Sequence, residues 1–451
     1  MNWRKPLIFS GLYLTRSKIP RCLMEIRRLE RLSKERIKED QQKKLKKLLL
    51  HAYENISYYH RILGEVGVVK NNVVDLSKFY KIPILTKKII RKQGSNLYSK
   101  DHKKRGSYEN SSGGSTGEPV RFIQDKYYDE WNTANKLNYK LQVNQEPGDK
   151  ELRLWGSDRD ILEGNEKLFI RLRNIIYNRK ELNSFKMSEK NMFDFVKSWN
   201  KYEPNWVEAY AQSIYEFARY IKRNNLKILS PKGILTSAGN LYPEMKELIK
   251  TVFNCPVFNR YGTREVGGVA CSCLDDKGLH VSMWSHYLEI LDKNLNSVKS
   301  NEFGKIYLTT LNNYSMPLIR YDVGDIGVYS DDKCNCGRNN ELIKNIEGRE
   351  MSVFKTKDGK VIPAEFFIHF IGVVYNEEFI SKFQVIQKDY DKVLIKIVLN
   401  DIKKFNTKKD KIIDSIKKVM GKNCEIEFDF VDDIKATRSG KYLYTKSEVM
   451  E

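Results

Sequence analysis

The chain has 451 residues, of which 41% are hydrophobic and 31% charged, so it can bury a large core and favours two or three domains over one. No apolar run reaches the roughly eighteen residues that a membrane-spanning helix needs, and we expect no signal peptide. The 80 basic residues exceed the 58 acidic ones by 22, which points to an anionic partner such as nucleic acid, a membrane surface or a phosphorylated substrate.

The first predicted elements are helical and basic. Residues 16–47 hold 13 Lys and Arg against five Asp and Glu, and apolar residues recur near helical spacing from about residue 20 to residue 62. This pattern predicts an amphipathic helix with a solvated basic face. Contact with a membrane surface is the alternative, because apolar and aromatic residues such as Trp3 and Phe9 precede the basic run. No zinc finger, RNA-recognition signature or helix-turn-helix pattern is visible, so no specific nucleic acid is expected.

Strand-like and helical patterns alternate through the middle of the chain. Residues 204–223 show helical amphipathicity, residues 231–253 show a strand, a loop and a helix, and residues 288–292 and 304–311 have strand patterns. Such alternation predicts an α/β fold in which helices cover the sheets.

The pattern of strands and helices in the sequence changes after residue 348. Strand patterns at residues 392–400 and 424–431 flank an amphipathic helical pattern at residues 408–421. We therefore expect a small α+β domain of about a hundred residues at the C-terminal end.

The segment ENSSGGSTGEPVRF, residues 109–122, packs four hydroxyls and three glycines into nine residues. Successive backbone N–H groups with glycine freedom can form an anion-binding concavity, and the hydroxyls add donors. The segment is not a P-loop, because Glu118 follows Gly117 where that motif requires Lys. A flexible surface loop is the alternative that the composition allows.

Four later loops carry residues suited to chemistry. Glu265, in the glycine-flanked NRYGTREVGG, could bind Mg²⁺ beside a polyphosphate, and Asp325, in LIRYDVGDIG, could hydrogen-bond a ribose diol. Arg349 lies at the expected boundary between the two domains, and Lys441 follows a Ser-Gly turn in KATRSGKYLY. Taken singly, each is explained more simply by an ordinary turn or a solvated side chain.

Taken together and in this order, the motifs SSGGSTGEP, YGTRE, YDVGD, GR and TRSGK resemble those of the adenylate-forming superfamily of acyl-CoA synthetases and adenylation domains. Within it, the chain resembles the phenylacetate–CoA ligase branch, especially CapK-like members associated with capsule and surface-polysaccharide synthesis. The stretches HAYENISYYH and LSKFYKIPILTKKIIRK also resemble that branch. The resemblance implies a large α/β N-terminal domain over residues 1–348, with the basic helical segment, and a small, mobile α+β lid domain over residues 349–451.

The resemblance also implies roles for individual residues. Lys441 would reach from the small domain to the carboxylate and the α-phosphate, Glu265 would hold Mg²⁺, and Arg349, in the hinge motif, would contact ribose or phosphate. Relatives often show Asp just after the Gly-Arg pair, so the hinge residue stays unassigned between Glu350 and Met351. The implied ATP-binding residues are Ser111, Ser112, Gly113, Gly114, Ser115, Thr116 and Gly117 at the phosphates, Ser237, Ala238, Gly239 and Tyr261 at the adenine, Gly262 and Thr263 in the motif of that tyrosine, and Asp325 at the ribose.

The implied reaction begins with attack of a carboxylate on the α-phosphorus of ATP, which yields an acyl-adenylate and pyrophosphate. The small domain would then swing and admit an acceptor, for which we expect the thiol of CoA. An amine or hydroxyl of a surface-polysaccharide precursor is the alternative acceptor. An alternative of another class is a non-catalytic basic scaffold that binds nucleic acid or anionic membrane.

The seven cysteines include two pairs one residue apart, in CSCLDDKGLH and CNCGR. Thiolates and imidazole are preferred zinc ligands, and four complete a closed structural site. By resemblance to the same branch we expect Cys273, His280, Cys334 and Cys336 to bind zinc, with Cys271 as a spare. Reduced buried thiols and a strand-end histidine are the alternative. Close cysteine pairs also favour a reducing compartment, so we expect the protein in the cytoplasm, where its basic N-terminus could meet the inner face of the membrane.

Overall fold

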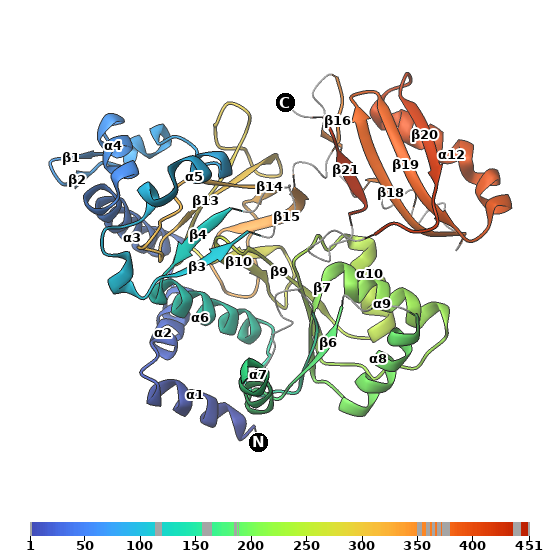
Figure 1. Cartoon of the computed structure of the whole chain (residues 1–451), viewed down its shortest axis with the longest axis horizontal. Coiled ribbons are helices and arrows are strands. Elements are labelled where there is room, and N and C mark those ends of the chain that lie inside the picture. The colour runs from blue at the N-terminus through green and yellow to red at the C-terminus, as the bar shows by residue number, and fades with distance from the viewer. Residues whose placement is uncertain are drawn as a thin grey trace.

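The computed structural model divides into a large N-terminal unit and a small C-terminal unit, each built on a β-sheet with helices against it (Figure 1). Within the described residues, the large unit contains an 11-stranded sheet and the small unit a 4-stranded sheet. This arrangement confirms the expected α/β class with a small C-terminal α+β part. The described residues are 2–112, 120–155, 165–184, 187, 189–349, 354–357, 361–362, 366–367, 371, 379–435 and 443–449.

The basic N-terminal segment forms separate helices. The helices are α1 (Arg4–Leu14), α2 (Ile19–Leu29), α3 (Lys34–Asn55) and α4 (Ser57–Glu65). The prediction of one amphipathic helix over residues 16–47 is wrong, because the Ser33 hydroxyl accepts the Arg36 N–H at 3.4 Å and caps a new helix. Among the described residues, none of the helices combines the length and the apolar character needed to cross a bilayer.

Helix α2 packs on α6 (Lys126–Gln142), which runs beside the large sheet. Ile26 and Leu29 of α2 form a buried cluster with Trp131 of α6 and with Trp284. The apolar stripe of α2 therefore faces the protein, and its arginines face outward.

Short elements lead from these helices to the sheet, and a buried arginine anchors them. The guanidinium of Arg320, 1% exposed, donates to the carbonyls of Tyr80 (2.6 Å) and Ile82 (2.7 Å) and pairs with the Glu289 carboxylate (3.0 Å). A buried charge is tolerated when it is paired and hydrogen-bonded in this way. The short elements are β1 (Val69–Lys70), β2 (Val73–Val74), η1 (Leu76–Lys81), α5 (Lys87–Gln93), η2 (Gly94–Leu97) and η3 (His102–Arg105).

The parallel half of the large sheet alternates strands and helices. Its elements are β5 (Glu151–Trp155), α7 (Asn165–Ile176), β6 (Arg179–Asn183), α8 (Glu189–Tyr202), β7 (Trp206–Tyr210), α9 (Ala211–Arg223), β8 (Gly233–Ser237), α10 (Pro243–Phe253) and β9 (Val257–Thr263). The predicted strand, loop and helix over residues 231–253 are confirmed. The prediction of a helix over residues 204–223 is wrong at its start, where pairing with β5 and β8 on both sides makes β7 a strand.

Antiparallel strands complete the large sheet. They are β10 (Gly267–Ser272), β11 (Leu279–Val281), β12 (His286–Leu291), β13 (Phe303–Thr310), β14 (Tyr321–Ser330) and β15 (Leu342–Arg349). The sheet order is β12-β13-β14-β15-β11-β10-β9-β8-β7-β5-β6. Strands β12 and β13 confirm the strand patterns predicted at residues 288–292 and 304–311.

The small unit packs a helix on its sheet, in the order β20-β19-β18-β21. Alternate residues Val393, Ile395 and Ile397 are buried against Phe405 and Ile412 of the helix, which confirms the small α+β unit expected from the pattern. Its elements are β16 (Phe354–Lys355), β17 (Val361–Ile362), β18 (Ile380–Asp389), β19 (Lys392–Leu399), α12 (Ile402–Met420), β20 (Glu425–Phe430) and β21 (Thr445–Ser447).

Helix α9 of the large unit contacts the small unit. The Arg219 guanidinium donates to the Ser381 carbonyl at 3.1 Å, and the Tyr444 hydroxyl donates to the Glu216 carboxylate at 3.1 Å. One turn of α9 therefore contacts both β18 and the start of β21.

Replacing Arg320 with Met tests the anchor. The Glu289 carboxylate, 11% exposed, would lose its cation, so the free energy of unfolding should fall by about 3–5 kcal/mol in chemical denaturation. Arg28→Met removes an exposed ion pair with Glu25 and should change that free energy by less than about 1 kcal/mol. Equal stability of Arg320→Met and the wild type would show that the buried pair does not hold the segment.

Candidate functional site

The loop rich in Ser and Gly begins and ends on a hairpin of β3 (Tyr108–Ser111) and β4 (Arg121–Gln124). The Ser112 N–H donates to the Val120 carbonyl at 2.9 Å, and the Val120 N–H donates to the Ser112 hydroxyl at 2.8 Å. These two bonds close the base of the loop, with Ser111 and Ser112 on one side of it. The predicted phosphate contacts Gly113, Gly114, Ser115, Thr116 and Gly117 lie outside the described residues.

The side-chain amide of Gln124 joins the base of this loop to a second motif. Its Nε2 donates to the carbonyls of Arg264 (3.1 Å) and Glu265 (3.2 Å), and its Oε1 accepts from the Asn110 amide (3.1 Å). Gln124 is 2% exposed, so water competes little for these bonds. The hairpin at the base of the loop is thereby joined to the acidic turn.

Glu265 lies in the tight turn between β9 and β10. A Cβ on Gly262 would lie 2.2 Å from the Gly267 carbonyl oxygen, so this hairpin requires glycine there. The Thr263 hydroxyl accepts the Val266 N–H at 3.4 Å and braces the same turn. The Tyr321 hydroxyl lies 3.4 Å from one oxygen of the buried Glu265 carboxylate, which still has acceptor capacity for a cation.

The Tyr261 hydroxyl donates to the Asp325 carboxylate at 2.7 Å. The two residues lie on β9 and β14, which are not neighbours in the sheet, so the fold unites motifs far apart in sequence. A half-buried aromatic ring beside a carboxylate suits a nucleoside, since the ring can stack on a base and the carboxylate can accept from ribose hydroxyls. Arg349 pairs with Asp325 through the β14–β15 ladder, and its side chain is outside the described part of the structure.

The segment from Ser237 to Gly239 follows β8 at the carboxyl edge of the parallel strands, the edge where open α/β sheets bind ligands. Ala238 has a positive φ of 58°. A Cβ on Gly239 would lie 2.0 Å from the Gln212 amide oxygen, so the backbone passes close over the start of α9. The described part of the predicted nucleotide site consists of this segment, Ser111 and Ser112, the stretch from Tyr261 to Thr263, Glu265 and Asp325. Lys441 lies outside the described residues.

Four predicted zinc ligands converge. The ligand atoms of Cys273, His280, Cys334 and Cys336 all lie within 4.8 Å of one another. The Cys273 and Cys334 sulfurs are 3.4 Å apart, and the Cys336 sulfur is 3.3 Å from His280 Nε2. Burial, aided by Arg338, lowers the pKa of His280 to about 4 and keeps the imidazole in its neutral, ligating form. Cys271 is fully buried in an apolar cluster instead.

A charged cluster between α6 and the parallel strands was not predicted. The buried carboxylates Glu151 and Glu208 contact Lys140, Arg153 and Arg260. The sequence indicates this cluster by the two charges at alternate positions of ELRLW and the single charge in WVEAY, because a parallel strand covered on both faces is ordinarily apolar throughout.

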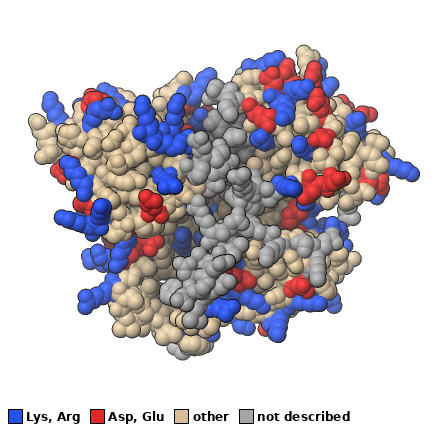
Figure 2. Space-filling model, viewed as in Figure 1, with Lys and Arg blue, Asp and Glu red and all other residues tan. Residues whose placement is uncertain are grey.

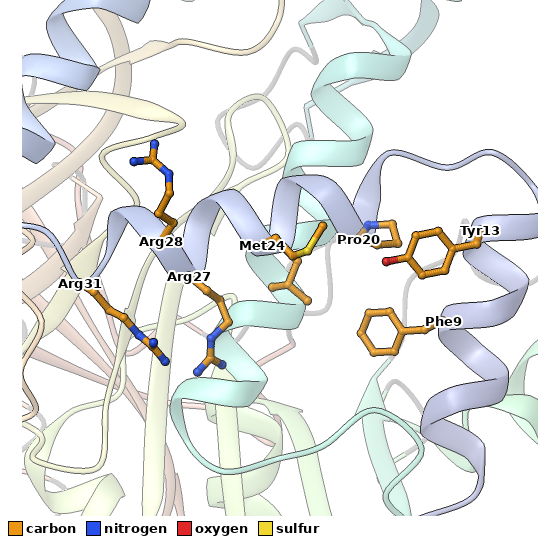
Figure 3. Close-up of a pocket in the computed structure, with 8 residues that line it drawn as sticks. Phe9, Tyr13, Pro20, Met24, Arg27, Arg28 and Arg31 are labelled. Carbon is orange, nitrogen blue, oxygen red and sulfur yellow. The ribbon is translucent and has the colours of Figure 1, made fainter.

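A groove of about 640 Å³ lies between α1 and α2, apart from the strand ends that carry the motifs. Phe9 and Tyr13 of α1 face Pro20 and Met24 of α2 across it (Figure 3). Arginines on α2 and just after its end continue the wall, so the groove has an apolar floor and a cationic rim. These arginines are Arg27, Arg28 and Arg31.

Comparisons with known proteins agree with this architecture. Residues 354–448 match the CapK C-terminal domain. Protein CapK of Staphylococcus aureus is 25% identical over 403 residues, which cover 88% of this chain and 86% of the relative. Phenylacetate–coenzyme A ligase of Thermus thermophilus is 23% identical over 353 residues, which cover 75% of this chain and 76% of the relative.

Among solved structures, 2-hydroxyisobutyryl-CoA ligase in its postadenylation state has the same fold, with a TM-score of 0.73 at 16% identity over 93% of this chain and 91% of that one. The same ligase in its thioesterification state gives a TM-score of 0.60, at 17% identity over 93% and 92% of the two chains. The CapK C-terminal domain at residues 354–448 and the similarity to these proteins along most of the chain together indicate the adenylate-forming superfamily, and within it the CapK-like proteins.

Proposed function

We propose that this enzyme uses ATP and Mg²⁺ to activate a small carboxylic acid as an acyl-adenylate and then transfers the acyl group to the thiol of CoA. The observation that carries the proposal is the pairing of Tyr261 with Asp325 beside the Glu265 turn that Gln124 ties to the loop of residues 111–117. One assembly then contains an aromatic ring for the base, a carboxylate for the ribose and a second carboxylate for the cation. The same assembly includes the hairpin from which the Ser- and Gly-rich loop begins.

In this assembly the residues have distinct roles. Tyr261 and the segment from Ser237 to Gly239 would bind adenine, and Asp325 would accept from the ribose hydroxyls. Glu265 would hold Mg²⁺, which supplies positive charge at the phosphoryl oxygens when bound. Arg349 would contact ribose or phosphate, and the loop donors would stabilise charge that grows as the carboxylate displaces pyrophosphate.

Lys441 would neutralise charge at the reacting carboxylate and the α-phosphate. It lies three positions before Tyr444, whose hydroxyl contacts Glu216 of the large unit, and a chain step of three positions spans at most about 10 Å. We also propose that the large domain ends at residue 348, that the small domain begins at residue 349, and that the small domain is mobile. The structure is more similar to the postadenylation state of 2-hydroxyisobutyryl-CoA ligase than to its thioesterification state, and the existence of these two states in that ligase is the reason for proposing a mobile small domain here.

The acceptor has a second candidate. It comes from the sequence resemblance to CapK-like members associated with surface-polysaccharide synthesis, and in it an amine or hydroxyl of a glycan precursor would replace CoA. A purely non-catalytic scaffold is not retained, because the chain is an adenylate-forming ligase. On the face shown in Figure 2, Lys and Arg side chains are spread widely rather than gathered in one band, which does not favour a nucleic-acid channel.

One zinc ion bound by Cys273, His280, Cys334 and Cys336 is also proposed, as a structural site. Four donors within 4.8 Å fit a tetrahedral ion, whose thiolate ligands lie about 2.3 Å from the metal. The segment that carries Cys334 and Cys336 also binds the N-terminal helices, since Arg338 pairs with the buried Glu30 at 3.3 Å. Loss of zinc would therefore loosen α2 as well.

Peripheral contact with the inner face of an anionic membrane is proposed for α1 and α2. Leu14 is 85% exposed and Met24 61%, beside the groove lined by Arg27 and Arg31. An apolar surface next to arginines suits insertion among acidic lipid headgroups.

Lys441→Ala separates the two half-reactions. Adenylate formation should slow by roughly 10²- to 10³-fold, the scale of losing one strong transition-state donor, while consumption of a supplied acyl-adenylate should hardly change. Single-turnover kinetics on each half measures both. Lys446→Ala, on an exposed ion pair with Glu448, is the matched control and should affect neither. Equal slowing of both halves by Lys441→Ala would contradict the domain swing.

Elemental analysis tests the metal site. Protein purified without chelator should contain about one zinc per chain, and Cys336→Ser should lower both zinc content and melting temperature. Cys271→Ser is the matched control, since it alters a buried thiol outside the cluster and should keep the zinc. Full zinc content in Cys336→Ser, or none in the wild type, would remove this proposal and leave the catalytic one intact.

Vesicle flotation tests the membrane contact. The protein should float with vesicles of phosphatidylglycerol and phosphatidylcholine but not of phosphatidylcholine alone, and high salt or Arg27→Glu with Arg31→Glu should abolish flotation. Lys403→Glu with Lys404→Glu makes the same charge change on exposed residues of α12 and should not. Identical flotation of the wild type and both double variants would show that the basic face of α2 is simply solvated and does not bind the membrane.

A further inference from the structure

On strands β5 and β7, charged side chains stand on the face opposite the main core. In β5, Leu152 and Leu154 are buried in the main core, whereas Glu151 and Arg153 point the other way, toward α6. Strand β7 repeats the pattern, with Glu208 on the charged face. Packing alone does not require charges there, because burying them costs free energy that apolar side chains would not.

Cations predominate on this face. Glu208, 3% exposed, contacts Arg260, Arg153 Nε at 3.3 Å and Lys140 Nζ at 3.5 Å. Glu151 contacts Lys140 and, at 3.0 Å, Arg179.

Lys136 adds a fifth cation to Lys140, Arg153, Arg179 and Arg260. Against these five stand the two buried carboxylates and, among the described residues, the more exposed Glu181 and Asp129. At least one positive charge therefore stays uncompensated by the described protein groups.

Lys136 lies between this cluster and the proposed nucleotide site. Tyr128, Asn132, Lys136 and Lys140 recur every four residues, so they line one face of α6. At one end Lys140 contacts Glu208. At the other, Asn132 accepts the Gly268 N–H at 3.0 Å in the hairpin that carries Glu265.

The Lys136 side chain is exposed and forms no hydrogen bond or ion pair with the described residues. Solvent reaches this side chain, but many protein atoms also surround it. Their desolvating effect and, second, the charge of Arg260 lower the pKa of Lys136 to about 8. A side chain that is accessible to solvent yet crowded by protein and by another cation is well placed to receive an anion.

Aromatic rings border the cluster at the carboxyl edge of the strands. Trp155 ends β5 and Tyr210 ends β7, with ring centroids 4.1 Å apart. The Arg153 guanidinium lies 4.9 Å from the centre of the Trp155 ring and that of Arg260 5.8 Å from it. Ser237, at the end of β8, is on the same edge, so the cluster opens next to the segment proposed to bind adenine.

We infer that the acid activated by this enzyme carries a second anionic group, a carboxylate or a phosphate, which Lys136 binds together with Arg153 and Arg260. This inference rests on the proposed function, because the reacting carboxylate must lie toward Glu265. One to two turns of α6 separate Lys136 from the residues beside that hairpin, so about 5–11 Å would separate the two acidic groups. Trp155 would pack against the body of the substrate between them.

Pyrophosphate release measured with matched acids tests the inference. The probes are straight-chain monocarboxylic acids, dicarboxylic acids and ω-phosphono carboxylic acids of equal length, together with phenylacetate and 4-carboxyphenylacetate. The dianionic acids should exceed their monoanionic partners at least tenfold in kcat/KM, and the better of the two dianionic series identifies the second group. Lys136→Gln should lower kcat/KM for the dianionic acids by about 10- to 100-fold, the loss of one charged hydrogen bond, and change the monoanionic acids less than twofold.

Lys250→Gln, at an exposed ion pair on α10, is the matched control and should leave both series unchanged. Equal use of monoanionic and dianionic acids by the wild type, or equal slowing of both by Lys136→Gln, would overturn the inference. If no acid releases pyrophosphate, the proposed function fails. The present inference is then tested separately, by measuring the binding of the same acids to the protein with calorimetry. Binding of dianionic acids that Lys136→Gln abolishes would sustain it, and binding that ignores the substitution would overturn it.

Discussion

The side-chain amide of Gln124 is the contact on which the candidate site depends. It lies at the end of the hairpin that carries the Ser- and Gly-rich loop, and it donates to two carbonyls of the turn that carries Glu265. A phosphate loop and a cation ligand can cooperate only at a separation set by the ATP phosphates, and catalytic geometry tolerates little error. Gln124 joins the base of that loop, at Asn110, to the Glu265 turn with neutral, buried bonds, without adding a charge that would compete for the metal.

Strand β9 makes the arrangement possible. Because adjacent residues on a strand point to opposite faces, Tyr261 reaches Asp325 on one side while Arg260 reaches Glu208 on the other. Strand β9 thus contributes to the proposed nucleotide site through Tyr261. Through Arg260 it also contributes to the charged cluster that is proposed to bind the second anionic group of the substrate acid. The glycines at the β9–β10 turn let α6 approach closely, which brings Asn132 and Lys136 to the same region.

Sequence motifs were sufficient to predict the class of fold, the convergence of four possible zinc ligands and the candidates Tyr261, Glu265 and Asp325. The structure brings Tyr261 and Asp325 into contact, and the roles of these residues stay predictions. The motifs did not identify Gln124 or Lys136, since an amide in a strand and a lysine on a helix acquire their roles from residues that only the fold brings next to them, such as Glu265 and Arg260. The strand β7 was taken for the start of a helix for a similar reason. Its amphipathic pattern favours a helix, and pairing with strands on both sides decides otherwise.

The most direct test of the whole account is acid-dependent exchange of labelled pyrophosphate into ATP, measured across a library of carboxylic acids with wild type and Glu265→Gln. Exchange requires reversible formation of an adenylate and needs no knowledge of the acceptor. The account predicts exchange that depends on both Mg²⁺ and a particular acid, and that falls by at least about 10²-fold in Glu265→Gln, the scale of losing a group that stabilises the transition state. Exchange equally fast in Glu265→Gln, or ATP binding with no exchange for any acid, would contradict it.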